Sequence, residues 1–404
     1  MLRNLSEGYI RKSLSSAEYD TIIQCSGAAV EFGVKIYLIG GIVRDLLLGF
    51  PVKDIDITVE GSAEEFVKFI QKKFKPKTVR FNKNLPTAKV RFKNNVEIDF
   101  ASTRSEVYPV QGELPVIKKI GTPLKDDVLR RDFTINSIAL SLNKSDFLKL
   151  IDYTGGIEDL KNKKIRVLHD NSFYDDPSRI IRGLKFSQRY GFNTEKHTLE
   201  LQNIYLSSPL KNIPLKRVKD EITETFSSVK YSPFDEFLHQ GLYKIFRTDS
   251  PLNIVGEKIH ELIFDFEIKE EDFALLYFLP LLFGTEIPEK FNLSLREISI
   301  INEVNKICLQ DINFNSDLEI KEYFDLKDYL VCVFYGLLKD KSVSKKYFSK
   351  LAKIKLCING SDLKKFGIPE GKRYGEILRK VLAHKIKHGL KTKEDELRYL
   401  KSLL

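Results

Sequence analysis

The sequence contains few cysteines. Its 404 residues include only four, Cys25, Cys308, Cys332 and Cys357, and no two of them stand in a short motif. Neither a structural zinc site nor a disulfide framework is therefore expected. The apolar neighbours of Cys332 and Cys357 indicate buried thiols, which are common among free cysteines.

Long apolar segments are also missing. No run reaches the roughly 18 apolar residues that a membrane-spanning helix requires. The first residues, MLRNLSEGYIRKS, contain no apolar stretch of signal-peptide length. We therefore expect a cytoplasmic protein with no membrane partner. Hydrophobic residues make up 42% of the chain, which is enough for a sizeable core.

Acidic residues are scarce near the end of the sequence. Residues 341–404 hold 18 Lys and Arg against 6 Asp and Glu, a net charge of +12, whereas the whole chain carries +10. The remainder is therefore close to −2. A polyanion is the simplest partner for such a basic segment, and a solvated helical surface is the alternative.

The pattern of apolar residues changes near residue 150. Before it, the apolar run 35–41, which ends in two glycines, indicates a strand that enters a tight turn. Further strands are predicted at 54–60, 87–92 and 96–102, helices at 42–49 and 62–74, a polar loop from about 104 to 125, and a mostly helical segment at 133–142. After it, strand signals are rare. We therefore expect an α+β protein with segments 1–150, 151–225, 226–340 and 341–404.

Two aspartates alternate on the strand predicted at 54–60. Residues i and i+2 of a strand point to the same side, so Asp54 and Asp56 are expected to project their carboxylates together. Asp99 supplies a third carboxylate from another predicted strand. Hard oxygen ligands of this kind suit Mg²⁺. A D-x-D pair alone is more typical of a solvated strand face.

A glycine pair precedes these aspartates. Gly40 and Gly41 stand at a predicted strand-to-helix turn, where exposed backbone N–H groups attract phosphate. Arg44 lies one turn into the helix and can add charge-assisted hydrogen bonds to a triphosphate. A phosphate-binding turn followed by paired carboxylates indicates a nucleoside triphosphate site.

Five segments in order resemble the motifs of class II tRNA nucleotidyltransferases and bacterial poly(A) polymerases, within the DNA polymerase β superfamily. The matching segments are LIGGIVRDLLLG with DIDI, RRDFTINSIAL (130–140), DYTGGIEDL (152–160), DDPSRIIRGLKFSQRYGF (175–192) and PLKRVKDEITETF (214–226). They cover roughly residues 35–226. INGSDLKKFGIPEGKRYGEIL (358–378) is similar to the family's RNA-contacting tail.

This resemblance implies a small mixed β/α nucleotidyltransferase head of the DNA polymerase β type, followed by an all-helical neck, body and tail. It implies Mg²⁺ as cofactor, held by Asp54, Asp56 and Asp99, with CTP, ATP and the tRNA 3′ end as partners. It places Arg130, Asp132, Asn136 and Arg182 at the nucleotide, and Lys364, Lys365, Lys372 and Arg373 at the RNA.

Asp176 and Arg179 are the residues expected to choose the base. Pro177 favours a helix start, and residues three apart share a helical face. The Asp176 carboxylate offers an acceptor, and the Arg179 guanidinium offers donors beside it. This pattern complements the amino group and the ring nitrogen of both cytosine and adenine. Uracil and guanine present the reverse pattern, and each mismatch costs about 1–3 kcal/mol. Asp176 as a simple helix cap and Arg179 in an ion pair are the alternative.

The activity expected is addition of C and A to the tRNA 3′ end. A-only or CC-only addition and poly(A) synthesis share the same motifs. In this family CC-adding enzymes lack part of the loop that 105–128 matches, and here it is full length, which favours CCA or A addition. A non-catalytic RNA-binding protein of the same fold is the distant alternative. No feature of the sequence indicates an oligomeric state.

Overall fold

The computed structural model describes residues 2–208, 213–227, 232–247, 251, 254–284, 291–310 and 312–404. The chain divides into two compact units. One comprises Met1–Glu221 with Gln240–Phe246, and the other comprises Ile222–His239 with Arg247–Leu404. The four-segment division expected from the sequence stays a prediction. Within the described residues, no helix is long and apolar enough to cross a membrane.

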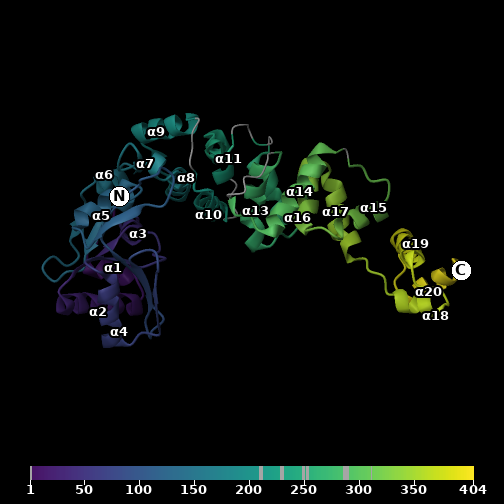
Figure 1. The fold of residues 1–404 in the computed structure, drawn as a ribbon, viewed down its shortest axis with the longest axis horizontal. Helices are drawn as coiled ribbons and strands as arrows, with labels where there is room; N and C mark the ends of the chain where they lie inside the picture. Colours follow the sequence, from purple (N-terminus) through teal and green to yellow (C-terminus); the bar gives the residue numbers. More distant parts are fainter. Residues whose placement is uncertain are drawn as a thin grey trace. The chain divides into compact units, whose positions relative to one another are not determined.

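A seven-stranded sheet forms the centre of the first unit (Figure 1). Its order is β3-β4-β5-β2-β1-β8-β9, and only β2 and β5 are neighbours that run parallel. The strands are β1 (Lys35–Ile39), β2 (Asp56–Glu60), β3 (Thr78–Phe81), β4 (Thr87–Arg91), β5 (Glu97–Ser102), β8 (Ala139–Ser141) and β9 (Leu150–Ile151). The hairpin predicted from 87–92 and 96–102 is confirmed. The strand predicted at 54–60 begins at Asp56, so Asp54 lies just before it.

Helices cover one face of this sheet (Figure 1). The first 32 residues form α1 (Glu7–Ser13) and α2 (Ser16–Phe32), and a reciprocal capping box of Ser15 and Glu18 begins α2. In α4 (Ala63–Phe74), Phe66 packs edge-on against Phe100 of β5, with ring centroids 5.9 Å apart. Because Asp99 precedes Phe100 on the strand, its side chain points to the opposite face.

Two local predictions were wrong. The expected loop at 104–125 contains an antiparallel pair, β6 (Arg104–Val107) and β7 (Val116–Ile120), and then α5 (Leu124–Leu129). The expected helix at 133–142 is a single 3-10 turn, η1 (Thr134–Asn136), followed by β8. A short run that is apolar on all sides fits a buried strand as well as a buried helix. Residues 139–141 form a strand because they pair with β1.

After β9 the first unit is mainly helical, with only the two-residue strands β10 (Lys164–Ile165) and β11 (Asn193–Thr194). Its helices are α6 (Gly156–Lys161), α7 (Ser172–Asp175), α8 (Ser178–Tyr190), α9 (Lys196–Ser207) and the first turns of α10 (Leu215–Phe226), with η2 (Leu242–Ile245). Asp176 does cap α8, because its Oδ1 accepts from Ser178 N at 3.1 Å.

The described residues of the second unit form helices and no strands. Its elements after α10 are α11 (Ser232–His239), α12 (Gly256–Asp265), η3 (Glu270–Asp272), α13 (Phe273–Phe278), η4 (Leu279–Leu282), α14 (Leu295–Leu309), α15 (Asp317–Phe324), α16 (Tyr329–Leu338), α17 (Lys341–Ser349), η6 (Leu351–Lys353), α18 (Gly360–Lys365), α19 (Lys372–His388) and α20 (Lys393–Ser402). Leu276, Tyr277 and Phe278 are fully buried, so the aromatic stretch 273–284 contributes to its core.

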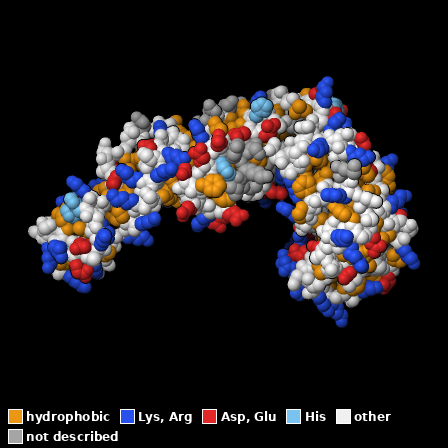
Figure 2. All heavy atoms as spheres, turned by 180° about the vertical axis from the view of Figure 1, so that it is seen from behind, with side chains coloured by type: hydrophobic (Ala, Val, Ile, Leu, Met, Phe, Trp, Pro, Cys, Tyr) orange, Lys and Arg blue, Asp and Glu red, His pale blue; other side chains and the backbone are white. Residues whose placement is uncertain are grey.

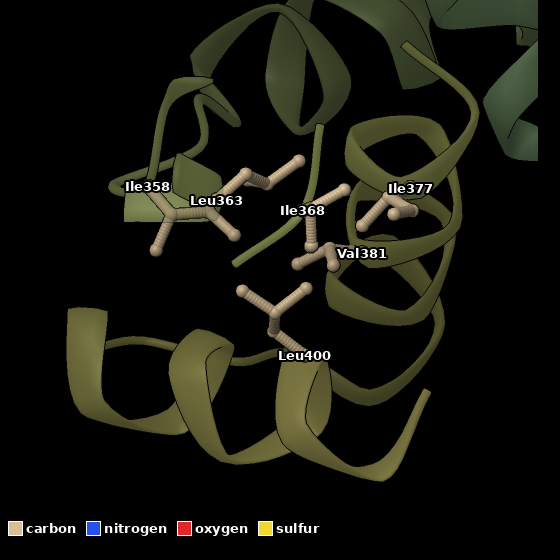
Figure 3. Close-up of a cluster of buried hydrophobic side chains, with 6 residues drawn as sticks. All are labelled: Ile358, Leu363, Ile368, Ile377, Val381 and Leu400. Atoms are coloured by element: carbon tan, nitrogen blue, oxygen red, sulfur yellow. The ribbon is translucent and has the colours of Figure 1, made fainter. Parts of the chain in front are cut away.

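The last three helices enclose a small core of their own (Figure 3). Leu363 of α18, Val381 of α19 and Leu400 of α20 are fully buried in it. The buried thiol expected at Cys332 is confirmed, but Cys357 is exposed. The prediction for Cys357 was wrong because the apolar side chain facing this core is that of the next residue, Ile358.

Candidate active site

The glycine pair forms a tight turn between β1 and α3 (Gly41–Leu48). Gly40 has a φ of 76°, a left-handed conformation that favours glycine, and Gly49 ends α3 in the same region. A Cβ at Gly40 would lie 3.3 Å from Nη1 of Arg131. The turn therefore leaves room for a guanidinium group directly beside the N-terminus of α3.

Asp56 and Asp99 lie side by side on β2 and β5. They are register partners in the parallel pair, and Asp99 N donates to Ile55 O at 2.9 Å. Burial, together with the negative charge of Asp99, raises the pKa of Asp56 to about 6, while Arg131 acts in the opposite direction. Asp54 is exposed and adds to the negative potential at Asp56. The sequence left open whether the strand of Asp99 lies beside that of Asp56, and the structure pairs the two strands.

A lysine occupies the other side of Asp99. Lys89 of β4 is its register partner, and the Lys89 Nζ to Asp99 Oδ2 distance is 3.1 Å. In the described part of the chain, no three His, Cys, Asp or Glu residues already converge as a metal site. The adjacent carboxylates of Asp56 and Asp99 nevertheless fit Mg²⁺ chemically, and Asp54 and Asp99 line a polar hollow. The metal set of Asp54, Asp56 and Asp99 stays a prediction.

Arg44 is buried in the structure. Its Nε lies 3.0 Å from Asp45 Oδ1, its Nη1 donates to Asn136 Oδ1, and its guanidinium lies against the rings of Phe186 and Tyr190. These contacts fix Asn136 beside the glycine turn. The predicted contact of Arg44 with a triphosphate stays a prediction.

Asp132 connects the head sheet region to α8. Its Oδ2 accepts from Arg182 Nε at 2.8 Å and Nη2 at 2.6 Å, and its Oδ1 accepts from Asn136 Nδ2 at 3.0 Å. Burial acts to raise the pKa of Asp132, but the Arg182 guanidinium and the hydrogen bonds lower it to about 2. Arg182 also pairs with Glu221 at 3.0 Å. The second, fourth and fifth motif-like segments thus meet at one ionic network.

Asp176 and Arg179 are both buried beside this network. The Oδ2 of Asp176 lies 2.5 Å from Arg217 Nη2. Arg179 donates to Ser172 Oγ at 2.7 Å, to the Arg130 carbonyl at 3.3 Å and to the Tyr108 hydroxyl at 3.4 Å. Asp176 can cap α8 and still contact a base, because a carboxylate offers about four acceptor sites. Arg179 can likewise keep these partners and contact a base, because a guanidinium has five donors.

A cavity of about 400 Å³ brings most of these side chains together. It is lined by six arginines, three acidic residues and Tyr108 among others: Leu85, Arg104, Glu106, Tyr108, Leu114, Pro115, Arg130, Arg131, Asp132, Asp176, Arg179, Arg182 and Arg217. Predicted residues Arg130, Asp132, Asp176, Arg179 and Arg182 line it. An arginine-rich cavity suits a polyphosphate.

Sequence reasoning missed Arg131, Glu106, Tyr108 and Asp127. Arg131 lines the arginine-rich cavity, and its positive charge lowers the pKa of Asp56, so it connects this cavity to the carboxylates. Its Nη2 lies 3.1 Å from Asp127 Oδ2, and its buried Nε has no hydrogen-bond partner among the described residues. The doubled arginine of RRDF was the available signal. Tyr108 had none, because its contact with Arg179 spans 71 residues.

The residues predicted to bind RNA lie on α18 and at the start of α19. All four, Lys364, Lys365, Lys372 and Arg373, are exposed. Figure 2 shows Lys and Arg side chains gathered over this end of the chain. Their role in RNA binding stays a prediction.

Comparisons with known proteins place the head domain and the whole fold among known enzymes. The model of the poly A polymerase head domain matches residues 36–166. A Geobacter sulfurreducens A-adding tRNA nucleotidyltransferase is 32% identical over 401 residues, covering 91% of this chain and 45% of the relative. A CCA-adding enzyme in complex with ATP is 27% identical, with a TM-score of 0.80 over 100% of both chains. The Thermotoga maritima CCA-adding enzyme complexed with tRNA-CCA is 26% identical, with a TM-score of 0.74 over 100% of this chain and 99% of that one.

The chain spans a little under half the length of the first curated relatives it matches. The solved structures, in contrast, match it from end to end. The structural matches cover both the mixed α/β head and the helical remainder. The chain thus carries a poly A polymerase head domain, and its whole fold is similar to that of the CCA-adding enzymes, which are class II tRNA nucleotidyltransferases.

Proposed function

We propose that this protein adds C and A to the 3′ end of tRNA without a nucleic acid template, using CTP and ATP and releasing pyrophosphate. One observation carries the proposal. The positive charge of Arg131 lowers the pKa of Asp56, and the same residue lines the cavity that contains Asp176 and Arg179. Carboxylates for phosphoryl transfer and side chains for base selection therefore share one compact unit.

In the proposed reaction the 3′-hydroxyl oxygen of the acceptor bonds to the α-phosphorus of the nucleotide. The bond from that phosphorus to the bridging oxygen of pyrophosphate breaks, and the hydroxyl proton is lost to solvent. Mg²⁺ bound at Asp54, Asp56 and Asp99 would favour ionisation of the hydroxyl and neutralise charge on the phosphates. Arg130 and Arg131 hold the triphosphate by charge-assisted hydrogen bonds.

Base selection falls to Asp176 and Arg179. Arg217 on Asp176 and Ser172 on Arg179 keep both side chains in place, so the pair presents its remaining acceptor and donors to the base. Cytosine and adenine complement such a pair, whereas uracil and guanine would leave buried groups unsatisfied at about 1–3 kcal/mol each.

Addition of A alone is the second candidate. It is favoured by the name of the Geobacter sulfurreducens relative, an A-adding enzyme that matches 91% of this chain. In that case CTP would fail as a substrate on every acceptor, while ATP would be added to tRNA that already ends in CC.

The experiment uses three tRNA transcripts that end before the first C, after one C and after CC. Each is incubated with CTP, ATP or both in the presence of Mg²⁺, and the products are sequenced. Extension to CCA from all three supports the first candidate, and a single A on the last transcript alone supports the second. Absence of any transfer contradicts both.

A matched pair of variants tests the carboxylates. Asp54→Ala is expected to abolish transfer while tRNA affinity changes less than twofold. Asp20→Ala, an exposed aspartate on α2, serves as control and should retain full activity. If Asp54→Ala remains active, or fails to fold, the role assigned to Asp54 is wrong.

A further inference from the structure

A row of four charged side chains crosses the first unit's sheet. Arg80 of β3 is the register partner of Lys89 on β4, Lys89 is the partner of Asp99 on β5, and Asp99 is the partner of Asp56 on β2. Register partners on neighbouring strands project to the same face. One face therefore carries two cations that lead, strand by strand, to the two carboxylates.

The cationic half of this row is accessible. Arg80 is exposed, and its side chain has no ion-pair or hydrogen-bond partner among the described residues. The side chains of Lys89 and Asp99 are 46% and 40% exposed. Their ion pair is consequently screened by water and is worth about 0–1 kcal/mol. An incoming anion can therefore exchange with Asp99 for the Lys89 ammonium at little cost.

A hollow of about 390 Å³ lies on this side of the carboxylates. Its wall includes Lys53, Asp54, Lys89, Arg91 and Asp99, whereas the nucleotide cavity includes none of the three aspartates. The α1–α2 turn at Ser15 and Glu18 forms its rim. Its lining also includes Glu18 and Glu97, so three cations stand there beside four carboxylates. Asp54 and Asp99 thus border a concavity separate from the arginine-lined one, and the reaction proposed above has two reactants, both of which carry phosphate.

The nucleotide cavity already has base-reading groups and six arginines, which leaves the second hollow for the acceptor. An acceptor strand ends in a hydroxyl, and one negative phosphodiester precedes each of its last nucleotides. Neighbouring strands stand about 4.8 Å apart, so Lys89 and Arg80 lie about 5 and 10 Å from Asp99 along the sheet. A strand whose hydroxyl reaches Asp99 would pass its last phosphodiesters over this row.

We propose that Arg80 and Lys89 form a backbone subsite for the last phosphodiesters of the acceptor strand. The inference rests on the proposed function and adds the path by which the acceptor reaches the carboxylates. Point charges that read phosphate carry no base specificity. The subsite would therefore accept ends of different sequence, as an enzyme that extends its own product requires.

Arg80→Gln, Lys89→Gln and the double variant test this subsite. Affinity for a tRNA transcript ending in CC is measured by filter binding at several salt concentrations, and KM is measured separately for the transcript and for ATP. Each single variant should weaken transcript binding about 3- to 10-fold. Each should also lower the slope of log affinity against log salt by about 0.7, the value for one single-strand phosphate contact. The KM for ATP should change less than twofold.

Lys72→Gln is the matched control. Lys72 is an equally exposed cation on α4, which covers the opposite face of the sheet, so its removal changes the net charge equally. Binding and slope should stay as in the unaltered protein apart from a small uniform effect. Lys89→Arg retains the charge and should restore most of the affinity that Lys89→Gln loses.

Two results would overturn the subsite. Unchanged transcript affinity and salt slope in the double variant would show that no phosphate lies there. A rise in the KM for ATP, with the transcript KM unchanged, would assign the row to the triphosphate instead. Failure of the unaltered protein to extend any transcript is a different outcome, because it would contradict the proposed function itself.

Discussion

Arg182 donates two hydrogen bonds to Asp132 Oδ2, from Nε at 2.8 Å and from Nη2 at 2.6 Å, although the two residues are 50 positions apart in the sequence. Asp132 precedes η1 in the head, and Arg182 belongs to α8. Their pairing joins α8, which carries Arg179, to the segment before η1, within the compact unit that also contains the carboxylates.

Arg182→Gln is expected to destabilise the protein by roughly 2–4 kcal/mol at neutral pH, because it leaves the Asp132 carboxylate buried without its cation. The pKa of Asp132 lies near 2 in the folded chain, below its ordinary value near 4. Its ionised form therefore contributes stability above pH 4, and this is lost as the pH falls towards 2. The difference between the two proteins in urea unfolding should shrink across that window. Arg91→Gln, which breaks the exposed pair with Glu97, should cost at most about 1 kcal/mol.

Asp56→Asn should stabilise the metal-free protein slightly and abolish its response to Mg²⁺. The substitution removes the like-charge contact with Asp99 that burial makes costly. Thermal melts with and without Mg²⁺ measure both effects. An upward shift of the melting temperature with Mg²⁺ in the original chain, absent from the variant, is the expected pattern. Equal shifts in both proteins would place the metal elsewhere.

Arg179→Gln should relax the choice of nucleotide. Loss of the guanidinium removes the donors that reject uracil and guanine, so the ratio of kcat/KM for ATP over GTP should fall about 5- to 100-fold. Competition assays with mixed triphosphates measure this ratio. Arg189→Gln, on the same helix but outside the cavity, is the control and should leave the ratio unchanged.

Gly156→Ala should destabilise the first unit strongly. An added Cβ would lie 2.2 Å from the Thr134 carbonyl oxygen, and neither backbone segment can move without disturbing α6 and η1. A cost of about 3 kcal/mol is expected from such overpacking. Gly27→Ala, in α2 with open space around it, should instead be neutral or stabilise by up to about 1 kcal/mol. Chemical unfolding of the two variants compares them directly.

Lys372→Gln combined with Arg373→Gln should weaken tRNA binding about tenfold without changing kcat at saturating tRNA. Both side chains are exposed at the start of α19, where they are free to contact phosphate. A control with Lys353→Gln and Lys355→Gln removes the same charge from exposed positions before α18. If the two double variants weaken tRNA binding equally, the tail acts only through its net charge.

Local sequence determined the parts of this protein whose physics is local. The turn at Gly40 was predictable because a left-handed backbone favours glycine, and the alternation at 96–102 indicated a strand because one face of β5 is buried. The alternation at 54–60 indicated a strand as well, although the middle of β2 is buried on both faces. Predictions failed where tertiary pairing decides, as at 133–142, whose apolar residues fit either a helix or a strand until β1 provides a partner.

The sequence by itself named Asp54, Asp56, Asp99, Asp176 and Arg179, because their residue types and spacing suit phosphoryl transfer and base pairing. Only the tertiary structure placed Asp99 beside Asp56, set Lys89 and Arg80 in the same row, and brought Arg131 and Tyr108 to the nucleotide cavity. The physical reason is that register and long-range ion pairs join residues tens of positions apart, and no local pattern records which strands become neighbours.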